Sequence, residues 1–187
     1  MAVWTAVVVW AVSGVAWAKD APARPTTWAH ERSDLTPDPS VKFGKLANGM
    51  RYALKRNGSP SGAVTIFLKI AAGSLHETDA QKGLAHFLEH MAFAGSTNVP
   101  RGEMMKTLQR LGARPGADAN AFTSFDETVY MFELPHADAT SVDTAFMLLR
   151  EVADRLTLTQ EAMDAERGVV IEELRIADRP AARSART

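Results

Sequence analysis

Two histidines and a glutamate lie within five consecutive positions of the segment GLAHFLEHMAFAGS, residues 83–96. On an α-helix each residue advances about 100°, so His86 and His90 lie about 40° apart, and Glu89 lies about 60° to the other side of His86. Two imidazoles in this arrangement can bind one divalent ion, and a carboxylate on the same face can reach a water bound to that ion. The segment therefore predicts a metal centre that can activate water.

The alternative is that these three side chains are partly exposed and bind nothing. The rest of the segment is apolar, however, and burying such groups without partners costs several kcal/mol, which favours a metal. The order His-x-x-Glu-His is also the inverted form of the zincin motif. Since the sequence contains no cysteine, the metal must be held by His, Asp or Glu side chains.

A catalytic zinc ion takes three protein ligands and keeps its fourth position for water. The best candidates for the third ligand are Glu166 and Glu173 in the segment AERGVVIEEL. Seven helical residues come to about 700°, so these two carboxylates share one face with Val169 and Val170, whereas Glu172 points about 100° away. A solvated helix edge is the alternative, but the aliphatic neighbours indicate that this face is turned inward.

The helices that carry these residues need a core, and the sequence around them predicts an α+β domain. Short apolar runs alternate with turn signals such as Asn48-Gly49, and Pro100 and Gly112 bound one of the helical patterns. We expect strands over 41–46, 50–56, 63–73, 119–125 and 127–135, and helices over 83–96, 101–112, 138–156 and 159–177. This order predicts a two-layer fold, a mostly antiparallel sheet with helices on one face.

The first forty residues differ in composition from the rest of the chain. Residues 1–18 carry no charged side chain and end in Ala16-Trp17-Ala18, which predicts a secretory signal peptide, with an uncleaved membrane anchor as the alternative. Residues 19–40 are rich in proline and polar side chains, which is typical of a linker or an extended arm. We therefore expect an exported protein whose folded domain covers 41–187, and contact with a membrane only if the leader is retained.

The charge balance excludes one class of partner. The chain has 21 basic and 22 acidic residues, a formal net charge of −1 and no basic run. Nucleic acids and anionic lipid surfaces are bound by clustered positive charge, so we expect no nucleic-acid partner.

Four segments in this order resemble the zinc metallopeptidase family of pitrilysin, insulin-degrading enzyme and mitochondrial processing peptidase, the inverzincins. They are GSLHETDAQKGLAHFLEHMAFAGS, NVPRGEMMKTLQRLGA, NAFTSFDETVYMFELP and ERGVVIEE. The resemblance extends from about Val41 to Leu174 and is greatest to the exported bacterial branch, which implies a periplasmic location.

The resemblance implies a zinc-dependent endopeptidase that hydrolyses extended peptides. One Zn²⁺ per chain would be bound by His86, His90 and Glu173, with Glu89 as the general base on the water and Glu166 supporting the ligands. The resemblance also assigns peptide binding to four residues on an edge strand to which the substrate adds by β-augmentation: Asn120, Ala121, Phe122 and Thr123.

The resemblance further implies that the domain is incomplete. Family members build their substrate chamber from several α+β units, and the chain ends before a second unit, with Pro180 where a long helix is expected to continue. We therefore expect an amino-terminal fragment that acts with a carboxy-terminal half or a partner subunit on peptide or unfolded protein substrates. The alternative is a non-catalytic family module that binds or assembles with a partner chain, although such partners usually lose motif residues.

Overall fold

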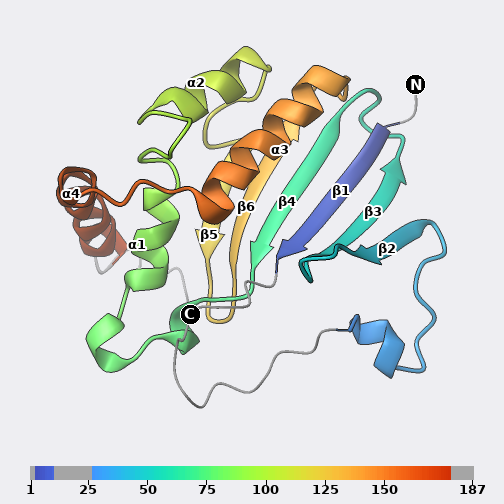
Figure 1. Ribbon diagram of the computed structural model, residues 1–187, viewed down its shortest axis with the longest axis horizontal. Coiled ribbons are helices and arrows are strands. Elements are labelled where there is room, and N and C mark those ends of the chain that lie inside the picture. The colour runs from blue at the N-terminus through green and yellow to red at the C-terminus, as the bar shows by residue number, and fades with distance from the viewer. Residues whose placement is uncertain (1–2, 11–26, 178–187) are drawn as a thin grey trace.

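The computed structural model describes the backbone of residues 3–10 and 27–177 and the side chains of residues 27–176. Figure 1 shows one sheet with helices packed over it and beside it. The strands are β1 (Val3–Trp10), β2 (Val41–Lys45), β3 (Arg51–Asn57), β4 (Val64–Ile70), β5 (Ala119–Thr123) and β6 (Thr128–Leu134). The helices are α1 (Leu84–Met91), α2 (Glu103–Arg110), α3 (Ala139–Asp154) and α4 (Gln160–Ala177), with short 3₁₀ turns at Ala29–Arg32, Ser74–His76 and Asp79–Gln81.

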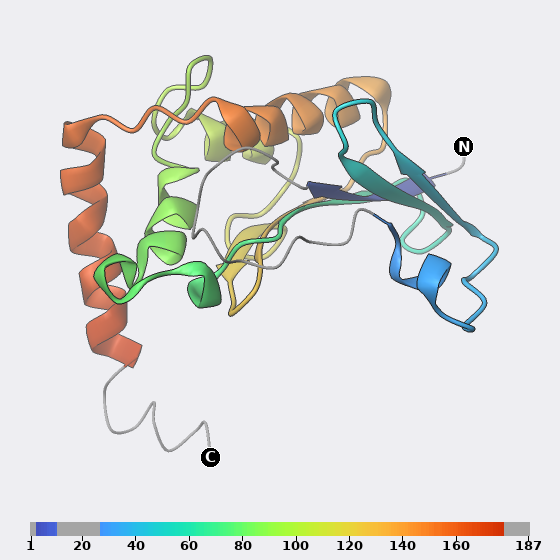
Figure 2. The ribbon, with the colours of Figure 1, turned by 60° about the horizontal axis from the view of Figure 1, so that its bottom comes forward.

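The strand order in the sheet is β2-β3-β1-β4-β6-β5. Every neighbouring pair is antiparallel except β1 and β4, which are parallel. Helices α2 and α3 lie over one face of the sheet, while α1 lies beside its β5 end and α4 lies beyond α1 (Figures 1 and 2). The prediction of a mostly antiparallel sheet with helices on one face is therefore confirmed.

The core lies between the sheet and the two helices above it. On β4 the buried residues alternate with less buried ones, as expected for a strand with one face turned to the core. Fully buried side chains from the sheet and from both helices meet in this layer: Ile66, Leu68, Phe132, Leu134, Leu108 and Leu148. The core thus fixes β6, and through it the neighbouring edge strand β5.

The predicted elements agree with the structure to within a few residues at most ends. The predicted turn at Asn48-Gly49 joins β2 to β3, with Gly49 at φ +90°. The largest difference is the helix predicted over 83–96, which ends at Met91. Two short-range turns follow, in which the amides of Phe93 and Ala94 donate to the carbonyls of His90 and Met91. The chain then turns at Gly95, whose φ of +128° is disfavoured for any other residue.

The amino-terminal segment occupies an unexpected place. Val3–Trp10, within the predicted leader, forms β1 between β3 and β4, while residues 11–18 lie outside the described residues. Neither cleavage nor anchoring of residues 1–18 is tested by this arrangement, so both stay predictions, as do the boundaries at 19–40 and 41–187. In the described part of the arm, Trp28 and His30 pack on Phe43 with ring centroids 4.9 and 4.4 Å away.

The described residues contain no helix that has both the length and the apolar character needed to cross a membrane.

Candidate metal centre

Helix α1 presents the predicted motif toward a cleft. The rings of His86 and His90 lie next to each other, with centroids 4.8 Å apart and planes at 84°. The side chain of His86 is 33% exposed and that of His90 is 15% exposed. The face expected from the helical spacing therefore exists in the folded chain.

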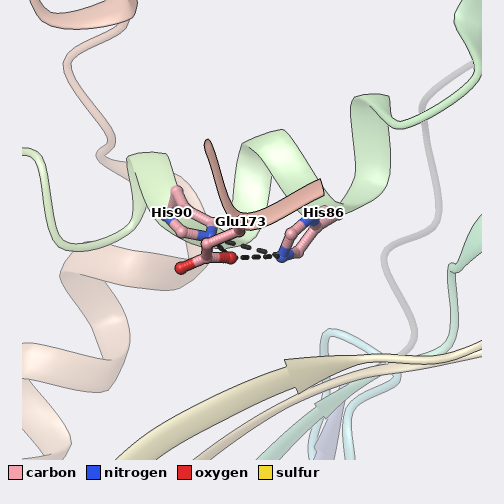
Figure 3. Close-up of side chains that lie close together, drawn as sticks. All are labelled: His86, His90 and Glu173. Carbon is pink, nitrogen blue, oxygen red and sulfur yellow. Dashed lines mark hydrogen bonds and ion pairs between the residues drawn. The ribbon is translucent and has the colours of Figure 1, made fainter. Parts of the chain in front are cut away.

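Helix α4 brings a carboxylate to these imidazoles, as Figure 3 shows. Glu173 Oε2 lies 3.6 Å from His86 Nε2 and 3.3 Å from His90 Nε2, and the two Nε2 atoms are 3.2 Å apart. In a tetrahedral zinc site with bonds of about 2.0–2.1 Å, neighbouring ligand atoms are about 3.3–3.4 Å apart. The three atoms therefore have the spacing of three corners of such a tetrahedron, and the residues fit a zinc ion.

The hydrogen bonding of His90 supports the same conclusion. Its Nδ1 lies 3.2 Å from Glu166 Oε1, and a carboxylate only accepts, so Nδ1 carries the proton. In a neutral imidazole the lone pair is then on Nε2, which faces the Glu173 carboxylate and the other imidazole. Converging lone pairs repel one another unless a proton or a cation lies between them, and a metal ion satisfies all three at once.

The structure distinguishes the two candidate glutamates. Glu173 meets both Nε2 atoms, whereas Glu166 contacts His90 from the opposite side of its ring. Val170 is buried as predicted, but Val169 is 46% exposed, so its assignment to the inward face is wrong. The reason is angular: the inward direction lies between Glu166 and Val170, and Val169 is about 100° of helix rotation away from Val170.

Glu89 lies on the same helix but outside the triangle of possible ligands. Its side chain is buried, and its Oε2 accepts a 2.6 Å hydrogen bond from Thr123 Oγ1 on β5. The neighbouring Thr128 hydroxyl donates to the carbonyl of Ala72, which fixes this part of the sheet. Burial, and secondarily the Glu89 carboxylate, raise the pKa of Tyr130, so this phenol stays neutral.

A cleft of about 560 Å³ is walled by α1, α4 and the edge strand β5. It is lined by the three possible ligands, by Glu89 and Glu166, by the side chains of Phe93 and Met105, and by all five residues of β5. The four residues assigned to peptide binding lie on this strand, in the order expected. The structure therefore places the triangle of possible metal ligands and a partly unpaired strand edge on the walls of one cleft.

Only part of the β5 edge is available. The carbonyl of Asp118 accepts from Glu133 on β6, and the amide of Ser124 donates to Glu127 just before β6. Since hydrogen-bonded and non-hydrogen-bonded pairs alternate along an antiparallel ladder, the main-chain groups of Ala121 and Thr123 point away from β6. The amide of Ala121 is capped by the Asn120 side chain at 2.9 Å. Beyond Thr123, the amides of Ser74 and Leu75 donate to the carbonyls of residues 124 and 125 and close the edge.

Two further residues that support the centre from behind were not expected from the sequence. Arg101 forms an ion pair with Glu166, and Glu151 binds the loop that carries Arg101. Neither residue belongs to an apolar period or a ligand spacing, and no local pattern marks them.

Comparison with known proteins adds to this geometry. The sequence profile of Insulinase (Peptidase family M16) matches residues 52–185 of the chain. The chain belongs to the insulinase family. Insulinase-family relatives include the "Probable zinc protease PqqL" of Haemophilus influenzae, which is 42% identical over 143 residues, or 76% of this chain and 15% of that protein.

Solved structures of insulinase-family proteins have the same fold. The periplasmic protease PqqL from Escherichia coli superposes with a TM-score of 0.77 and 36% identity, over 82% of this chain and 17% of that one. Pitrilysin superposes with a TM-score of 0.59 and 26% identity, over 73% of this chain and 14% of that one. The chain thus spans only about a sixth of the length of these relatives, and the predicted family and fold class are confirmed.

Proposed function

We propose that this chain carries the zinc site of an endopeptidase that hydrolyses extended peptides. The observation that supports the proposal most directly is the triangle of His86 Nε2, His90 Nε2 and Glu173 Oε2, with edges of 3.2–3.6 Å. Relatives of the chain are zinc proteases by name, which supports proteolysis in general. The substrate and the roles of single residues belong to the proposal.

The residues divide the chemistry between them. Zinc, when bound, lowers the pKa of a coordinated water to near neutrality and polarises a carbonyl group. Glu89 takes the proton from the attacking water and gives it to the leaving amine nitrogen of the scissile bond. Glu166 accepts from His90 Nδ1 and so keeps Nε2 directed at the ion, the usual arrangement behind a histidine ligand.

The peptide is held by β5. The outward main-chain groups of Ala121 and Thr123 pair with an extended substrate as an added strand. The Asn120 side chain now bonds the amide of Ala121, so it must leave this position and is then free to bind a substrate carbonyl. Phe122, 51% exposed, contributes apolar surface beside the bound peptide.

The relatives support a proposal on location and partners. The Escherichia coli protein is described as a periplasmic protease, and we propose the same exported location for this chain. Because the chain spans a small part of its relatives, we also propose that a carboxy-terminal half or partner subunit completes the enclosure for peptide or unfolded protein substrates.

The proposal is tested by zinc content per chain together with cleavage of an unstructured, quenched fluorescent peptide. We expect about one zinc per chain, with loss of zinc in Glu173→Gln. Glu89→Gln should keep zinc and lower the cleavage rate by at least about 100-fold. The control is Glu172→Gln, since Glu172 lies one residue away and pairs with Arg175 on the exposed surface.

The alternative of a non-catalytic family module gives a different result. A zinc-loaded chain that cleaves no peptide, alone or with the remainder of the protein supplied, contradicts the endopeptidase proposal and favours the module. No zinc binding by the unaltered chain after zinc is supplied contradicts the metal site itself.

A further inference from the structure

Arg101 lies behind the proposed zinc site and touches none of its ligands directly. Its Nη2 is 3.1 Å from Glu166 Oε2, while Glu166 Oε1 is 3.2 Å from His90 Nδ1. The Arg101 side chain is 51% exposed, but the Glu166 side chain is only 14% exposed. Each oxygen of the Glu166 carboxylate therefore has its own partner, and the two contacts fix the plane of the carboxylate.

The ion pair of Arg101 with Glu166 balances the negative charge around the cleft. Three carboxylates, those of Glu89, Glu166 and Glu173, gather beside the imidazoles of His86 and His90, which must be neutral to bind a metal. A divalent ion would leave this group with one net negative charge, and the guanidinium of Arg101 brings the formal total to zero. A mostly buried carboxylate costs free energy unless it is paired, so the ion pair offsets the cost of placing Glu166 behind His90.

The position of Arg101 is set independently of α4. Gly95 comes so close to Arg101 that a Cβ on Gly95 would lie 3.2 Å from the Arg101 amide nitrogen. In the same loop, the amide of Ser96 donates to the carbonyl of Val99, and the Ser96 hydroxyl donates to Glu151 of α3. The side chain of Glu151 is 1% exposed, so the loop is anchored in the core.

We propose that Arg101 is a positioning residue for the zinc site: it orients Glu166, which in turn directs His90 Nε2 at the ion, and so it strengthens zinc binding. This inference rests on the proposed function, because it assumes that His86, His90 and Glu173 bind zinc. Partners of this kind behind a histidine ligand typically change metal affinity about 10- to 100-fold.

The test is the zinc dissociation constant, measured by competition with a chromophoric chelator, which requires no peptidase activity. We expect Arg101→Gln to weaken zinc binding about tenfold. Arg101→Lys, which keeps the charge, should recover part of this loss. The control is Arg110→Gln. Arg110 is also exposed and paired with a glutamate, Glu103, but it lies on α2 and does not line the cleft that holds the proposed zinc site.

The same variants in a Glu166→Gln background give a double-mutant cycle. Arg101→Gln should add no further loss there, because its effect passes through Glu166. Equal losses in both backgrounds, or an unchanged affinity in Arg101→Gln, overturn the inference while the zinc site stands. If the unaltered chain binds no zinc, the zinc site fails and the inference fails with it. Thermal unfolding of the zinc-free variants checks that each one is folded.

Discussion

Thr123 on β5 donates a 2.6 Å hydrogen bond to Glu89 on α1 and so joins the edge strand to the proposed general base. A hydroxyl can donate to a carboxylate and accept from a carboxylic acid. Thr123 is therefore a suitable partner for a base that gains and loses a proton in each turnover.

Replacing this hydroxyl should lower turnover without removing zinc. Thr123→Val keeps the shape of the side chain but removes the hydroxyl that donates to Glu89. A hydrogen bond to a charged group contributes about 1.5–3 kcal/mol, so we expect kcat for peptide cleavage to fall about tenfold or more. Thr123→Ser should restore most of the rate. The control is Thr107→Val on α2. Its hydroxyl accepts from Arg110 on the same helix, so kcat should not change. Loss of zinc in Thr123→Val would show instead that the strand supports the metal site.

The open edge of β5 gives a second prediction, on substrate binding. Ala121→Pro removes one outward amide, and proline is tolerated where the amide of an edge strand faces away from its neighbour. A main-chain hydrogen bond contributes about 0.5–1.5 kcal/mol, so KM for an extended peptide should rise about three- to tenfold, with zinc content unchanged. Ala121→Ser keeps the amide and serves as the control. An unchanged KM in Ala121→Pro would argue against strand addition at this edge.

Glu151 should contribute strongly to stability. Its buried carboxylate accepts from the hydroxyl of Ser96, from the amide and side chain of Asn98, and from the Arg155 guanidinium. Breaking such a network leaves buried donors unpaired, so Glu151→Gln should lower the free energy of unfolding by roughly 3 kcal/mol in urea titrations. Asp154→Asn on the same helix removes two surface ion pairs, to Arg150 and Arg155, but leaves the Glu151 carboxylate in place, so its effect should stay below about 1 kcal/mol.

The same carboxylate predicts a pH dependence. Burial by itself raises the pKa of Glu151, but hydrogen bonds from Asn98, Ser96 and Arg155 outweigh it and lower the pKa from 4.5 to about 2. Because the folded pKa lies below the unfolded one, the contribution is complete above about pH 4.5 and is lost as the pH falls toward 2. The unfolding free energy should fall over this range more steeply for the unaltered chain than for Glu151→Gln. Parallel curves would contradict this prediction.

Zinc removal should affect α4 more than the rest of the fold. Among the described elements α4 packs mainly on α1, and within residues 160–176 Val170 is the one buried side chain, so the bond from Glu173 to the ion would provide much of the helix's anchorage. Zinc at 100 times its dissociation constant stabilises the bound state by about 2.7 kcal/mol. We expect a chelator to accelerate amide hydrogen exchange in α4 up to about 100-fold and to leave α3 nearly unchanged. Equal acceleration in both helices would indicate global unfolding.

The parts of the fold that local patterns control could be predicted from the sequence. The helical spacing placed His86, Glu89 and His90 on one face, and the turn at Asn48-Gly49 joined the expected strands. Helix periodicity also put Glu166 and Glu173 on one side of α4. It could not determine which of them meets the imidazoles, because that depends on how α4 crosses α1.

The supporting contacts could not be predicted, since they join residues far apart in the chain. Thr123 and Glu89 are 34 positions apart, Arg101 and Glu166 are 65 apart, and Asn98 and Glu151 are 53 apart. Each residue alone is typical of a solvated position, and only tertiary packing gives it a partner. The helix predicted to reach residue 96 ended early for a similar reason: Gly95 begins the loop that Glu151 holds.

The place of β1 has a consequence for maturation. Val3–Trp10 cannot be both a discarded leader and the strand between β3 and β4. Amino-terminal sequencing of the mature protein decides between these two fates. A protein cleaved after residue 18 would expose two facing sheet edges and need a donor strand, antiparallel to β3 and parallel to β4, from elsewhere. For such a protein, export and completion of the sheet would be coupled events.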